Sequence, residues 1–189
     1  MLGQMESGSS AAHPVIRSER LDLVLLTGEA MDALITSRED LGGCLMGFSL
    51  PHSFPEQHDL EFLRFRRAQL QATPEWAPWL VRAVVRRDDN LLVGTITFHG
   101  PPGINSLGAP RAVEVGYTIR AEVRNRGYAT EAARAMMEWA TERHGIRHFV
   151  SSIEPDNEPS LRVIRKLGFG ATGIVDDGEM IFELHLRSE

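Results

Sequence analysis

The chain has 189 residues, of which 42% are hydrophobic and 24% are charged, which is enough for one sizeable core and one domain. Its formal net charge of −6 argues against a partner held by many phosphate contacts, so we do not expect nucleic acid. The only cysteine is Cys44, and no apolar run approaches the roughly 20 residues that span a bilayer, so we expect a reducing, cytoplasmic compartment and no membrane partner.

The first 13 residues, MLGQMESGSSAAH, lack the basic and apolar regions of a signal peptide. They are small and polar, so we predict a disordered tail over residues 1–13 and a folded domain over residues 14–189.

The predicted elements of this domain mix strands and helices. In chain order, we expect a strand at 21–25, a short helix at 28–37, a loop at 42–55, a helix at 56–72, a hairpin within 76–100, a loop at 101–111, a strand at 112–120, a helix that begins between Gly127 and Thr130, a strand at 148–154, a helix at about 158–167 and a strand or hairpin over 170–187. This order predicts an α/β fold with a mixed sheet and helices on its faces.

The best-defined helix follows a cationic turn in the stretch EVRNRGYATEA, residues 122–132. Free N–H groups at a helix start form a cradle for an anion, and Gly127 lets a ligand approach the backbone. Arg124 and Arg126 would add positive charge. The alternative is that both arginines are solvated and that Gly127 only shapes a turn, and the spacing alone does not separate the two. The turn lacks the lysine and hydroxyl of an ATP-binding P-loop.

A second glycine-rich stretch, GFGATG at residues 168–173, matches the spacing of a dinucleotide fingerprint. That fingerprint needs a strand before it and a helix after it, whereas here a predicted helix comes first. We therefore read Gly168 as the end of the preceding helix.

Three stretches together resemble the GNAT N-acetyltransferase superfamily. VEVGYTIRAEVRNRGYATEA is similar to its acetyl-CoA-binding motif, with Arg124, Gly127 and Ala129 at the three defining positions. NEPSLRVIRKLGF, residues 157–169, resembles its second motif, and SERLDLVLL resembles the opening strand of the RimJ/RimL-like branch. The resemblance covers about residues 15–187. It implies a mixed, mostly antiparallel sheet of about six or seven strands, splayed at the acetyl-CoA site and flanked by about four helices.

The resemblance also implies which residues bind acetyl-CoA, the co-substrate, and it implies no metal. The pyrophosphate would contact the loop of Arg124, Asn125, Arg126, Gly127, Tyr128, Ala129 and Thr130. The strand at Tyr117, Thr118 and Ile119 would pair with the pantetheine arm, and Asn157 and Ser160 would contact it. Asn157 also suits a helix N-cap, and Ser160 suits an exposed first turn. Arg162, Arg165 and Lys166 would either meet the 3′-phosphate or form a solvated helix face.

Glu114 is the candidate general base, because it is the lone acid in an apolar strand and some family members use a glutamate there, directly or through water. Burial is expected to raise the pKa of its carboxyl. The alternative is a structural pair with Arg82 or Arg111. A backbone N–H near Ile119 would polarise the thioester carbonyl. Many members carry a tyrosine general acid where this chain has Ile164, which leaves the donor of that proton open.

The resemblance implies an acyltransferase that moves acetyl to a primary amine by direct attack, with a protein N-terminus as the first acceptor. The alternatives are a small amine, such as an aminoglycoside, polyamine or amino-acid-like metabolite, or a non-catalytic acyl-CoA sensor. Five aromatic residues would either shape the acceptor pocket or pack in the core: Phe48, His52, Phe54, Trp76 and Trp79. A zinc pair at His144 and His148 is not expected, because Gly145 breaks the helix between them. A homodimer is left open.

Overall fold

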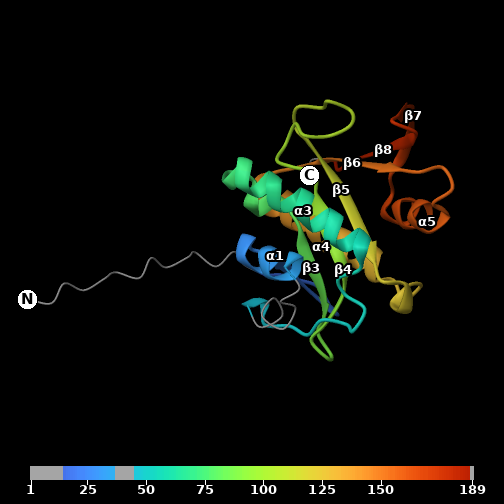
Figure 1. The fold of residues 1–189 in the computed structure, drawn as a ribbon. Helices are drawn as coiled ribbons and strands as arrows, with labels where there is room; N and C mark the ends of the chain where they lie inside the picture. Colours follow the sequence, from blue (N-terminus) through green and yellow to red (C-terminus); the bar gives the residue numbers. More distant parts are fainter. Residues whose placement is uncertain (1–14, 37–44, 188–189) are drawn as a thin grey trace, which may run out of the picture.

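The computed structural model describes residues 15–36 and 45–187, so the predicted tail and Cys44 lie outside the described residues. The strands form one eight-stranded sheet in the order β1-β2-β3-β4-β5-β6-β8-β7 (Figure 1). The elements are β1 Ile16–Arg17, β2 Leu21–Leu25, α1 Gly28–Ile35, α3 Gln57–Ala72, β3 Arg82–Arg86, β4 Leu91–Phe98, β5 Ala112–Ile119, α4 Tyr128–His144, β6 His148–Ile153, α5 Glu158–Leu167, β7 Gly170–Asp176 and β8 Glu179–His185. Within the described ranges, no helix combines the length and hydropathy needed to cross a bilayer.

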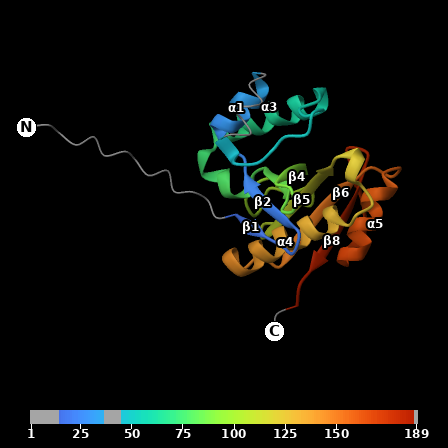
Figure 2. The same cartoon turned by 90° about the horizontal axis from the view of Figure 1, so that it is seen from below.

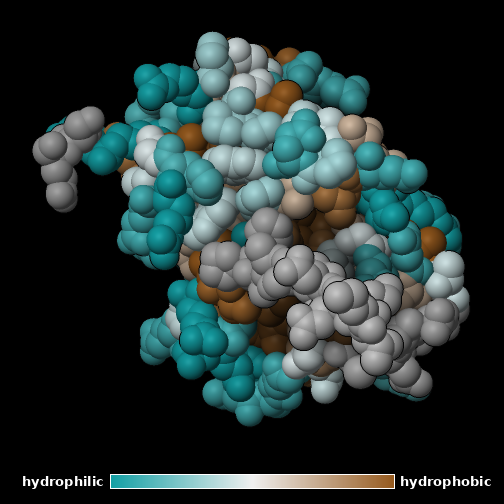
Figure 3. Space-filling model, turned by 90° about the vertical axis from the view of Figure 1, so that its left-hand side faces the viewer, coloured by the Kyte–Doolittle hydropathy of each residue, from teal (hydrophilic) through white to brown (hydrophobic). Residues whose placement is uncertain are grey.

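Helices cover both faces of the sheet, with α1 and α3 on one side and α4 on the other (Figure 2). Strand β3 is buried on both faces, because Val84 packs into the core on the α4 side while Ala83 and Val85 pack into the core on the α1 and α3 side. On the side of the molecule in Figure 3, hydrophilic residues cover most of the outer surface and hydrophobic residues gather in its hollowed centre.

The predicted α/β fold is confirmed, with one strand more than expected. The extra strand is β1, which has only two residues and is therefore too short to show an alternating pattern. The first predicted hairpin strand is also shorter than expected, because Pro74–Trp79 forms a 3₁₀ helix before β3 begins at Arg82. The predicted start of the best-defined helix is confirmed at Tyr128, and Gly168 ends α5 in the left-handed conformation.

The sheet opens between β5 and β6, which are the only parallel neighbours among the strands of the described residues. These strands pair over Ala112 to Glu114 only, whereas β5 stays paired with β4 as far as Ile119. Strand β6 instead follows β8 as far as Ile153. The Glu114 carbonyl faces β4, because it accepts a hydrogen bond from the His99 N–H. Backbone groups alternate in direction along a strand, so those of Tyr117 and Ile119 face the opening. The predicted splay is therefore present.

Gly94 of β4 permits the close approach of β4 and β5 beside this opening. A Cβ atom added at Gly94 would lie 2.2 Å from the carbonyl oxygen of Thr118. We expect Gly94→Ala to lower the free energy of unfolding by about 1–3 kcal/mol, because the strand pair must shift to relieve this overlap. Urea unfolding measures the effect. Gly170→Ala is the control, since a Cβ there meets nothing within 4 Å. Equal unfolding midpoints for the two variants would contradict the prediction.

Candidate active site

A cleft of about 590 Å³ lies where β5 and β6 separate. It is lined by Tyr117, Thr118, Ile119, Val123, Arg124, Asn125, Gly127, Tyr128, Ala129, Thr130, Asn157, Pro159, Ser160, Arg162, Val163 and Lys166. The structure thus brings together all the residues predicted for the coenzyme except Arg126. Arg162 and Lys166 reach the cleft from α5, whereas Arg165 is not among its lining residues. Sequence reasoning missed the apolar wall of Val123 and Val163.

The start of α4 has the backbone geometry that the predicted anion cradle needs, and anion binding there stays a prediction. Asn125 and Gly127 adopt left-handed backbone conformations, with φ of 61° and 84°, and the Gly127 cap offers no side-chain hydrogen bond. The first helical bond recorded at this end runs from the Glu131 N–H to the Gly127 carbonyl. The N–H groups of Tyr128, Ala129 and Thr130 precede that bond, so an α-helix provides them with no partner of its own.

Glu131 would place a negative charge in this first turn, but Arg20 neutralises it. An Arg20 Nη2 lies 2.6 Å from Glu131 Oε2, and the Ser18 hydroxyl donates to Oε1 at 2.7 Å. Arg20 also donates to the Arg126 carbonyl at 3.1 Å, which holds the turn against the helix. The Arg126 side chain is exposed, so its predicted contact with pyrophosphate stays a prediction.

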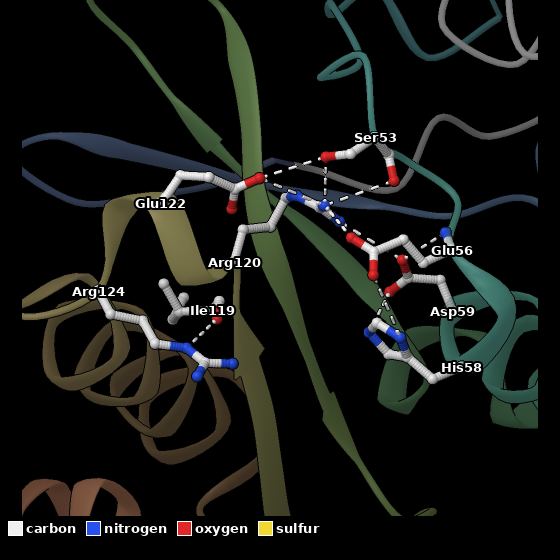
Figure 4. A network of polar contacts seen from close by, with 8 residues as sticks. All are labelled: Ser53, Glu56, His58, Asp59, Ile119, Arg120, Glu122 and Arg124. Carbon is white, nitrogen blue, oxygen red and sulfur yellow. Dashed lines mark hydrogen bonds and ion pairs between the residues drawn. The ribbon is translucent and has the colours of Figure 1, made fainter.

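Arg120 and Arg124 take different roles at the end of β5 (Figure 4). Arg124 Nε donates to the Ile119 carbonyl at 2.9 Å, which positions the guanidinium beside the cleft. Arg120 instead points to the start of α3, where it lies 2.7 Å from Glu56 and 3.4 Å from Asp59. This network borders a cavity of about 190 Å³ that shares Thr118, Ile119 and Arg124 with the cleft. The network therefore ties α3 to the end of β5 that borders the cleft.

Three residues join the cleft to a second cavity of about 200 Å³ on the other side of the opening. Tyr117, Asn157 and Ser160 line both spaces. Asn157 Oδ1 accepts from the Ser160 N–H at 3.2 Å, so its N-cap role is confirmed, and its predicted contact with the pantetheine arm stays a prediction. The Tyr117 hydroxyl donates to the Ser160 carbonyl at 3.3 Å. Burial raises the pKa of Tyr117 to about 12, so its phenol is neutral at pH 7.

Glu114 lies under this second cavity and is fully buried. Its Oε2 accepts from the Ser106 N–H and hydroxyl, both at 2.7 Å, and its Oε1 accepts from the Ser152 hydroxyl. Burial alone would raise the pKa of this carboxyl, but His99 and the two serines outweigh it and lower the pKa to about 2. The expectation of a raised pKa was therefore wrong, because it ignored donors from other segments.

Sequence reasoning also missed the other groups around this cavity. They come from the end of β4, from β5, from β6 and the segment after it, and from β8: His99, Gly116, Ser152, Glu154 and Glu179. No local motif connects them, so only the fold could reveal the cluster.

Most of the aromatic candidates for an acceptor pocket pack in the core instead. Phe48, Phe54 and Trp79 are buried, and Trp79 contacts the rings of Phe98 and Trp139. Phe54 also borders the 190 Å³ cavity.

His144 and His148, at which the sequence predicts no zinc pair, contact different groups. The His144 ring contacts Trp79 and Trp139, at centroid distances of 4.6 and 4.7 Å. His148 instead lies 2.9 Å from Glu183, which also contacts His185 at 3.1 Å. The absence of a functional metal stays a prediction.

These features define a class of protein. Residues 20–170 match the family model described as "Acetyltransferase (GNAT) domain", and the chain belongs to this family. The family uses acetyl-CoA as its acetyl donor.

Among curated proteins, the uncharacterized N-acetyltransferase YnaD of Bacillus subtilis is 31% identical over 90 residues. That match covers 48% of this chain and 49% of YnaD, about half the length of each. An acetyltransferase structure from Agrobacterium tumefaciens covers 97% of this chain and 100% of its own, with a TM-score of 0.61 and 23% identity. The apo structure of RimL, a "Ribosomal L7/L12 alpha-N-protein acetyltransferase", covers 93% and 100%, with a TM-score of 0.60 and 17% identity. These two likenesses show the fold.

Proposed function

We propose that this chain transfers the acetyl group of acetyl-CoA to a primary amine, by direct attack of the amine on the thioester. The observation that carries the proposal is the meeting of the coenzyme cleft and the second cavity across the open edge of β5. A thioester in the opening would face an amine in the cavity. Bound acetyl-CoA supplies an activated acetyl carbonyl and a thiolate leaving group.

The residues of the cleft fit the successive parts of the coenzyme. The N–H groups at the start of α4 would bind the pyrophosphate, helped by Arg124. The open backbone edge at Tyr117 would pair with the pantetheine amides as an added strand would. Arg162 and Lys166 offer positive charge for the 3′-phosphate. A backbone N–H of β5 near Ile119 would polarise the acetyl carbonyl.

The second cavity suits a cationic amine. Glu154 and Glu179 line it, and Glu114 lies beneath it. Burial, together with repulsion from Glu114 and Glu154, raises the pKa of Glu179, which indicates a region of concentrated negative potential. Such a potential attracts a protonated amine before it loses its proton.

A protein N-terminus is the acceptor we propose first. An α-amine with a pKa of about 8 costs about 1.4 kcal/mol to deprotonate at pH 7, whereas a lysine-type amine at about 10.4 costs about 4.6 kcal/mol. RimL is an alpha-N-protein acetyltransferase of ribosomal L7/L12, and this chain shares its fold. A small amine is the second candidate, because the cavity of about 200 Å³ leaves room for a compact amine group. We propose a cytoplasmic location, where acetyl-CoA is available.

Two measurements test this function. Calorimetric titration should show tight binding of acetyl-CoA but not of NADH or ATP. Mass spectrometry should then show acetyl transfer to N-terminal peptides more readily than to polyamines, aminoglycosides or amino acids. Binding without transfer to any amine would favour an acyl-CoA sensor, and absence of binding would refute the assignment of the cleft.

A further inference from the structure

We propose that His99 is the catalytic base that takes the proton from the acceptor amine, and that Glu114 is the positioning residue that holds His99. This inference rests on the proposed acetyl transfer. The protonated amine first releases one proton to solvent. The neutral nitrogen then forms a bond to the acetyl carbon and gives a second proton to His99 Nε2. The C–S bond breaks, its electron pair leaves with the coenzyme sulfur as thiolate, and His99 later returns the proton to solvent.

The backbone of His99 is fixed on two sides. Its N–H donates to the Glu114 carbonyl at 2.8 Å, as a continuation of the β4–β5 pairing. Its own carbonyl accepts from Arg66 Nη1 on α3 at 3.5 Å. The ring is thus carried by a rigid segment, although its side chain is 40% exposed and borders the second cavity.

The two ring nitrogens face different environments. Nδ1 lies 3.4 Å from Glu114 Oε1, so the buried carboxylate favours a proton on that nitrogen. The Nε2 edge lies over Gly116, where an added Cβ would meet Nε2 at 3.3 Å. In this tautomer Nε2 carries the free lone pair. Nε2 lies beside Gly116 of β5, and the next residue of that strand, Tyr117, borders the opening. A carboxylate that orients an imidazole in this way is a recurrent arrangement in acid–base catalysis.

Glu114 itself is badly placed to take the proton directly. Its side chain is 1% exposed, and its oxygens already accept from Ser106 and Ser152. A carboxylate saturated with donors is a weak base, but it remains a fixed negative charge that stabilises an imidazolium above it. Glu114 was predicted to act as the base directly or through water. In this proposal it acts instead through His99.

Other charged groups face His99 from the surrounding elements. Glu179 of β8 and Glu154 after β6 line the same cavity, and Arg66 of α3 contacts the His99 carbonyl. The two carboxylates give the cavity a negative potential that favours the entry of a cationic amine.

The test compares His99→Gln with His185→Gln, which removes an exposed histidine at the far end of β8. We expect His99→Gln to lower kcat by about 10²- to 10⁴-fold, with the affinity for acetyl-CoA changed less than about threefold. The acidic limb of the pH profile of kcat/KM should disappear. His185→Gln should keep wild-type turnover and the limb. Imidazole added to a His99→Gly variant should restore part of the activity.

Glu114→Gln tests the positioning role. We expect it to keep the acetyl-CoA affinity, to lower kcat, and to move the acidic limb rather than remove it, because His99 would remain without its carboxylate. Turnover of His99→Gln within about twofold of wild type at every pH would overturn the proposal. Failure of the proposed function would look different, because the wild-type chain itself would then bind no acetyl-CoA or acetylate no amine.

Discussion

Gly127→Glu is expected to abolish acetyl-CoA binding while the chain stays folded. Gly127 has a φ of 84°, and a Cβ there would lie 3.4 Å from Arg20 Nη2. A side chain is therefore strained at this position and competes for the space beside the turn. Its carboxylate would also meet the N–H groups proposed for the pyrophosphate and repel that anion. We expect the affinity to fall by at least about 100-fold, measured by calorimetry with circular dichroism as the check on folding.

Gly145→Glu is the matched control for this prediction. Gly145 ends the same helix α4, with a φ of 67°, and an added Cβ meets nothing within 4 Å. The control therefore carries a similar backbone strain without touching the cleft. Normal binding by Gly127→Glu, or an equal loss in both variants, would refute the anion cradle at the start of α4.

Glu114 is expected to make the folded state sensitive to acid. The pKa of its carboxyl is about 2 in the folded chain, below the ordinary value of 4.5. A lowered folded pKa stabilises the fold above pH 4.5, and this contribution is lost as the pH falls from 4.5 toward 2. A difference of this size corresponds to about 3 kcal/mol. Urea unfolding at several pH values between 6 and 2.5 measures it.

The comparison for this second prediction is Glu114→Gln against Glu142→Gln, which changes an exposed glutamate on α4. Glu114→Gln should be less stable than wild type at pH 6, because the amide NH2 group replaces one carboxylate oxygen and cannot accept from the serine donor at that position. Its stability should then fall less steeply with acid. Glu142→Gln should follow the wild-type curve. Parallel curves for all three proteins would contradict the proposed hydrogen bonding of the buried carboxylate.

The sequence by itself determined the features that arise from neighbouring residues. The turn from Arg124 to Gly127 and the helix after it are local, because free N–H groups and a left-handed glycine belong to a single short segment. The same locality explains why Asn157 could be predicted as an N-cap, whereas its contact with the coenzyme was expected only from the family resemblance. Strand β1 was missed for the opposite reason, since two residues carry no period.

The tertiary structure alone decided the chemistry around the predicted base. The sign of the pKa shift of Glu114 depends on donors from His99, Ser106 and Ser152, which lie on three separate segments. Burial of a lone acid in an apolar strand predicts a raised pKa, and only the arrival of those donors reverses it. Hydrogen bonds act over about 3 Å, whereas these groups are up to several tens of residues apart in the chain. Residues that meet only through folding leave no pattern of spacing, so His99 became visible only in the structure.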